Sequence, residues 1–64
     1  MNIQENSEYF CYLFDLQQSG RTNMFGAAPF LEDAFDLDKK KAKEILIYWM
    51  ENYDKIATEL GVEV

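Results

Sequence analysis

Two helical patterns separated by a very short break, between Pro29 and Leu46, constrain this chain more than any other feature. Proline lacks an amide hydrogen and clashes with the carbonyl four residues before it, so Pro29 must lie near the start of the first helix. Asp38 has a short side-chain oxygen that can accept from the free amides of a helix start, so it is expected to cap the second helix. The segment therefore predicts two helices joined by a tight turn at Asp36 and Leu37.

The chain of 64 residues is predicted to be one compact all-α domain of three helices, spanning about residues 7–18, 25–35 and 39–60. Apolar residues in the last span recur every three or four positions, which places them on one helical face. They are Ala42, Ile45, Leu46, Trp49, Tyr53, Ile56, Ala57 and Leu60. The second span is expected to bury Phe30, Leu31, Ala34 and Phe35.

The first span carries a similar apolar stripe of Tyr9, Leu13 and Leu16, which Phe10 and Phe14 widen. Asn6 or Ser7 is expected to cap its start. Gly20 is expected to end it and Gly61 to end the third helix, because glycine suits the left-handed position after a helix. The helices defined by Pro29, Asp38 and these glycines cover most of the chain.

The composition excludes several classes of protein. There is one cysteine, Cys11, and no histidine, so neither an intrachain disulfide nor a zinc site is expected. No glycine-rich phosphate loop is present, and the acidic residues match no calcium loop. We therefore expect a protein that is not an enzyme and has no cofactor or metal. Cys11, placed among aromatic residues in the middle of a helix, is expected to be a structural thiol.

Localisation is predicted from the same features. No apolar run approaches the ~20 residues that a membrane span needs. The first residues show neither the basic region nor the apolar stretch of a secretory signal. A single free cysteine fits a reducing compartment, so we expect a cytoplasmic protein.

Small size and a high aromatic content favour self-association. A domain of this length buries only about 60% of the surface of its unfolded chain, and oligomerisation is one way to add stability. Aromatic residues make up 16% of the chain, more than a small core easily buries. The candidate interaction surface is Tyr12, Ile47, Tyr48, Met50 and Tyr53; the tyrosines could instead fill the core. These residue types are enriched at the centres of protein interfaces.

A cluster of lysines offers a second hypothesis. Leu31, Phe35, Leu37, Ala42 and Ile45 surround the turn in a register that resembles the helix-turn-helix family. The first turns of the second helix of such a pair would read DNA. The candidate DNA-contacting residues are Arg21, Lys39, Lys40, Lys41 and Lys43.

Several features weaken that resemblance. Asp36 stands where the family prefers glycine, and Glu32 stands where it prefers a small residue. Lysines suit phosphates better than base edges, and nearby Asp38 and Glu44 repel phosphates. A lysine run on a helix is also often a solvated face. The net charge of −6 further disfavours nucleic acid.

A second resemblance concerns origin. The string Thr22-Asn23-Met24-Phe25-Gly26-Ala27-Ala28-Pro29-Phe30-Leu31, with Phe35, Leu37, Ile45, Leu46, Trp49 and Met50, resembles small uncharacterised proteins of tailed bacteriophages. The resemblance implies expression in a bacterial host cytoplasm and carries no assigned activity. We therefore predict a phage-type accessory protein that acts by protein–protein interaction, with itself as a possible partner in a homodimer. A DNA-binding regulator is the alternative.

Overall fold

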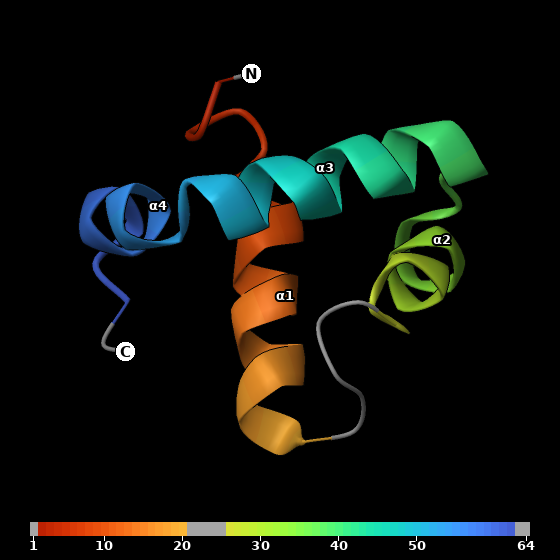
Figure 1. The fold of residues 1–64 in the computed structure, drawn as a ribbon, viewed down its shortest axis with the longest axis horizontal. Coiled ribbons are helices and arrows are strands. Elements are labelled where there is room, and N and C mark those ends of the chain that lie inside the picture. The colour runs from red at the N-terminus through yellow and green to blue at the C-terminus, as the bar shows by residue number, and fades with distance from the viewer. Residues whose placement is uncertain (1, 21–25, 63–64) are drawn as a thin grey trace.

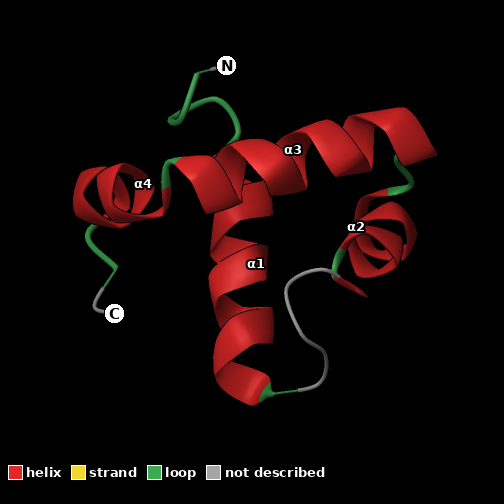
Figure 2. Ribbon diagram, viewed as in Figure 1, coloured by secondary structure: helices red, strands yellow, loops and turns green. Residues whose placement is uncertain are grey.

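The computed structural model describes residues 2–20 and 26–62, and this part of the chain is entirely helix, turn and loop. Its four helices are α1 (Ser7–Ser19), α2 (Ala28–Phe35), α3 (Lys39–Glu51) and α4 (Tyr53–Leu60). In Figure 1, α3 lies across one end of α1 like the bar of a T, and α2 and α4 lie at opposite ends of that bar. Figure 2 shows the same arrangement by element type. The all-α fold class is confirmed.

The prediction of three helices is wrong, because the helix expected over 39–60 breaks at Asn52. Asn52 has φ −122° and ψ 29°, which are not helical values. Its side-chain amide donates to the Tyr48 carbonyl at 3.0 Å, and its backbone amide donates to the same oxygen at 3.0 Å. Asparagine competes in this way with the regular helical ladder. The break turns α4 away from the axis of α3 (Figure 1).

The ends of α1 match the predicted span, but its start is stabilised differently. Asn6 is the N-cap residue, yet its side chain makes no capping bond. The Asn6 side-chain amide instead donates to the Asn2 carbonyl at 2.7 Å, which folds the preceding residues into a turn. Gly20 ends α1 with φ 70°, as predicted, and Gly61 ends α4 with φ 71°.

The turn between α2 and α3 follows the predicted chemistry. Pro29 lies in the first turn of α2, where its missing amide hydrogen removes no helical hydrogen bond. The helix was expected to start near Phe25 or Gly26; Phe25 lies outside the described residues, and α2 begins at Ala28, later than predicted. Asp36 ends α2 with φ 53°, a left-handed conformation that aspartate adopts less easily than glycine. Asp38 caps α3, since its side chain accepts from the Lys41 amide at 2.7 Å.

Loss of this cap is expected to weaken the fold measurably. We predict that Asp38→Ala lowers the free energy of unfolding by about 1 kcal/mol, because the amide of Lys41 loses its acceptor. Urea denaturation followed by circular dichroism measures the change. Asp33→Ala is the control, because it removes the same charge from an exposed position of α2. Equal losses in the two variants would contradict the capping role.

The core lies where α1, α3 and α4 meet and extends to α2. Its most enclosed large side chains are Trp49, Phe10, Leu13, Leu31, Ile45 and Ile56. The ring of Phe14 lies 5.3 Å from that of Trp49 and 5.2 Å from that of Tyr53, measured between centroids. These contacts join α1 to both α3 and α4. Trp49 Nε1 is buried and has no hydrogen-bond partner among the described residues, so the indole ring is held there by packing.

One expectation about the core is wrong. Of the four residues expected to be buried in the second helix, only Leu31 is; Ala34 is exposed, and Phe30 and Phe35 are half-buried. The two phenylalanines still pack against the core, at its margin. Ile3, which showed no periodic signal, is buried at 6% exposure by the N-terminal turn.

Within the described residues, no helix is both long enough and apolar enough to cross a membrane.

A candidate interaction groove between α2 and α3

A groove of about 480 Å³ runs between α2 and α3. Its residues come from both helices: Ala28, Pro29, Glu32, Lys39, Lys43, Leu46, Ile47 and Met50. Leu46 is buried at the base, whereas Lys39 and Lys43 are exposed. The groove therefore combines an apolar floor with charged groups, which suits a partner that has both an apolar anchor and polar neighbours.

Ile47 is the most unusual side chain of this groove. It is 41% exposed, and among the described residues no other large hydrophobic side chain is classed as exposed. Its neighbours Ile45 and Leu46 point to the core, and the helical repeat turns position 47 away from them. A single exposed isoleucine is ordinary. Here, however, Ile47 is continuous with the half-buried Met50 and the rest of the groove.

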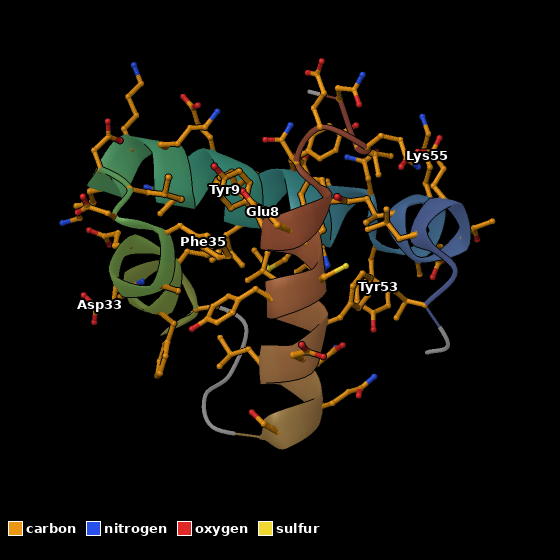
Figure 3. The ribbon with its side chains drawn as sticks, turned by 180° about the vertical axis from the view of Figure 1, so that it is seen from behind. Glu8, Tyr9, Asp33, Phe35, Tyr53 and Lys55 are labelled. Atoms are coloured by element: carbon orange, nitrogen blue, oxygen red, sulfur yellow. The ribbon has the colours of Figure 1, made fainter. Side chains whose placement is uncertain are left out.

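Aromatic contacts between α1 and α2 hold α2, one of the two helices that line this groove, in position. Tyr9 of α1 meets Phe35 of α2 edge to face with ring centroids 4.9 Å apart, and Figure 3 shows the two side chains close together. Tyr12 also contacts Phe35, at 5.5 Å, and its hydroxyl donates to the Phe30 carbonyl at 3.4 Å. Such edge-to-face pairs stabilise by about 0.5–1.5 kcal/mol beyond area burial. They fix α2 beside α1 while its other side lines the groove.

The five predicted interface residues do not form one patch. Ile47 and Met50 lie together in the groove. The three tyrosines are half-buried and contact other parts of the fold. Tyr12 contacts α2, as described above, and Tyr48 stacks on Phe10 with ring centroids 6.0 Å apart. Tyr53 packs on Trp49, and its hydroxyl donates to Gln17 Oε1 at 2.7 Å. Sequence periodicity did not distinguish these tyrosines from surface residues because they lie at the margin of the buried stripe.

The lysine cluster occupies the first turns of α3. Lys39, Lys40, Lys41 and Lys43 are all exposed there, and no acidic residue lies in the first turn of that helix. The helix dipole makes cations unfavourable at this end. Arg21, the fifth candidate DNA-contacting residue, lies outside the described residues. The same α3 later carries the exposed acids Glu44 and Glu51, so its charge changes sign along its length.

Three of the groove residues, Ala28, Pro29 and Glu32, come from α2. They join this surface because α2 stands beside α3. The signal available was indirect, since Leu46 belonged to the core stripe and Pro29 marked the start of a helix. A smaller hollow of about 240 Å³ lies on α1, beside Tyr12, Asp15, Leu16 and Ser19.

Cys11 is exposed on α1, so the expectation of a thiol enclosed by aromatic residues is wrong. Across the described ranges, no group of three cysteine, aspartate or glutamate side chains is placed to hold a metal ion.

No known protein-family model matches this chain, and neither curated proteins nor solved structures give a match. The groove is the surface from which function is inferred.

Proposed function

We propose that this chain is a small non-enzymatic accessory protein that acts by binding another protein, including a second copy of itself. The groove between α2 and α3 is the proposed contact surface. The observation that carries the proposal is Ile47, 41% exposed beside an apolar groove of about 480 Å³. Burial of the exposed 41% of this isoleucine stabilises a complex by about 0.6–1.2 kcal/mol, so Ile47 is a natural anchor.

The charge distribution supports a protein partner over nucleic acid. The chain carries twelve acidic and six basic residues, so its overall field repels phosphates. Asp36 and Asp38 are exposed beside the lysine cluster. An apolar groove also does not match a DNA backbone, because proteins contact the backbone through polar and ionic groups. The resemblance of the sequence to small phage proteins supports a role in the cytoplasm of an infected bacterium.

A DNA-binding function is the second candidate, and the observation that favours it is the exposed run Lys39 to Lys43 at the start of α3. In that function α2 and α3 would act as a helix-turn-helix pair, with the first turns of α3 in the major groove. Such binding depends strongly on salt, because phosphate contacts release counterions.

A DNA titration separates the two functions. We expect no binding when a fluorescent mixed-sequence duplex is titrated with protein at low salt, where even non-specific contacts are detectable. Fluorescence anisotropy measures the binding. The double variant Lys40→Glu with Lys43→Glu serves as a matched control for any weak signal. Micromolar binding that falls steeply with salt and disappears in the double variant would contradict the protein-binding proposal.

A further inference from the structure

We propose that the groove face is the interface of a two-fold symmetric homodimer in which α3 of one copy lies antiparallel to α3 of the other. The two Ile47 side chains meet at the centre. This inference rests on the proposed function, since it names the second copy as the partner and assigns the geometry of the contact. The order of charges along α3 is the reason for choosing a second copy as the partner.

Two exposed charges of α3, Lys43 and Glu51, lie equally far before and after Ile47 and have opposite signs, while the exposed Glu44 lies three residues before it. Lys43 lies four residues before Ile47, and Glu51 lies four residues after it. Residues four apart are neighbours on one side of a helix, so the three side chains share a face. All three are exposed. A second basic residue, Lys40, extends the basic end of the same face.

In an antiparallel pair of α3 helices, the opposite charges of Lys43 and Glu51 face each other at two symmetric places. A two-fold axis beside Ile47 reverses the direction of the second helix, so residues equally far before and after Ile47 come to the same level. Lys43 of each copy then lies level with Glu51 of the second copy. A parallel pair would instead place Lys43 beside Lys43 and Glu51 beside Glu51, and like charges at such an interface are unfavourable. The sequence of α3 therefore selects the antiparallel orientation.

The net charge also constrains how two copies meet. Each copy carries −6, so two copies repel unless the basic segment of one faces an acidic segment of the other. Four of the six basic residues lie at Lys39, Lys40, Lys41 and Lys43. The antiparallel arrangement brings this segment toward Glu51 of the second α3. It thereby converts an unfavourable overall charge into local attraction.

The groove supplies the apolar part of the contact. A stable interface buries about 800 Å² per partner, which is about a fifth of the 4246 Å² that this chain exposes. The face formed by α2 and α3 joins an exposed isoleucine to a groove lined by Leu46 and Met50. Ile47 of each copy fits against the groove of the other, and the aliphatic stems of Lys39 and Lys43 cover its rim.

Charge reversal tests the geometry. Lys43→Glu alone places two glutamates at each pair, and Glu51→Lys alone places two lysines there. We expect each single variant to dimerise about tenfold more weakly than the original protein. An equal mixture of the two variants restores both opposite-charge pairs, so it should form a heterodimer about as tight as the original dimer. Sedimentation equilibrium, with one variant carrying a fluorescent label, measures both.

Two exposed positions on α4 provide matched controls. Lys55→Glu changes the net charge as Lys43→Glu does, and Glu59→Lys changes it as Glu51→Lys does. Circular dichroism checks that each variant keeps its helices. The antiparallel pairing is overturned if the mixture gains nothing over the single variants, or if the controls behave like them. Self-association would still stand in either case. A wild-type chain that stays monomeric up to about 1 mM would overturn the pairing and self-association together.

Discussion

Phe10→Ala is expected to unfold a large fraction of the protein at 37 °C. Phe10 is 0% exposed and stacks on Tyr48 with ring centroids 6.0 Å apart. Truncation of such a buried ring costs about 3–5 kcal/mol, from lost apolar burial and from the cavity left behind. A domain of this length has a total stability of about 3–10 kcal/mol at the usual values per residue. The loss is therefore comparable with the whole stability.

The measurement can use a natural reporter. Trp49 is the single tryptophan and is buried in the same core, so its emission follows unfolding of the domain. Urea titrations give the free energy of unfolding of each variant. Cys11→Ala is the control, because Cys11 is the next residue of α1 and is exposed. A loss below about 1 kcal/mol in Phe10→Ala would contradict the assignment of this ring to the core.

Ile47→Asp is expected to weaken self-association by at least about tenfold while the fold is retained. By symmetry the substitution occurs twice in a dimer, and each isoleucine contributes about 0.6–1.2 kcal/mol, because only its exposed 41% is newly buried. The new carboxylates would also face each other near the two-fold axis and repel. The monomer loses only the burial of the part of Ile47 that already packs beside the groove, about 1–2 kcal/mol, because the rest of the side chain is exposed. Sedimentation equilibrium over a range of protein concentrations measures the dissociation constant.

The control for Ile47→Asp must add the same charge elsewhere. Thr58→Asp does so at an exposed position of α4, outside the groove. It should leave the dissociation constant within a few-fold of the original value, since only the overall charge changes. If Thr58→Asp and Ile47→Asp weaken association equally, net charge rather than the groove governs it. If neither has any effect, the contact surface is not centred on Ile47.

The features that were predictable from sequence depend on neighbouring residues. Asp38 caps α3 and Gly20 ends α1 because the required atoms lie within one turn of each other along the chain. The break at Asn52 was not predictable from periodicity. A bend changes the direction of a helix, but the apolar spacing continues from Trp49 through Ile56 with almost the same phase. The asparagine side chain that bonds to the Tyr48 carbonyl was the available signal.

The groove was predictable only in part. Ile47 and Met50 were identified because they lie beside the core stripe of α3. Tyr53 was grouped with them, yet it packs on Trp49 because the bend turns α4 toward α1. The contribution of α2 depends on the aromatic contacts between Tyr9 and Phe35, which join residues far apart in sequence. Spacing along one helix carries no information about such a pair.

The most direct test of the contact surface is a dilution series followed by two-dimensional ¹H–¹⁵N NMR of the unmodified protein. Residues at an interface change their amide chemical shifts as the dimer dissociates. We predict concentration-dependent shifts at Lys43, Ile47, Met50 and Ala28, with little change at Tyr53 and Gln17 on the other side of the core. Spectra that do not change with concentration, or shifts confined to α1 and α4, would contradict self-association through the groove.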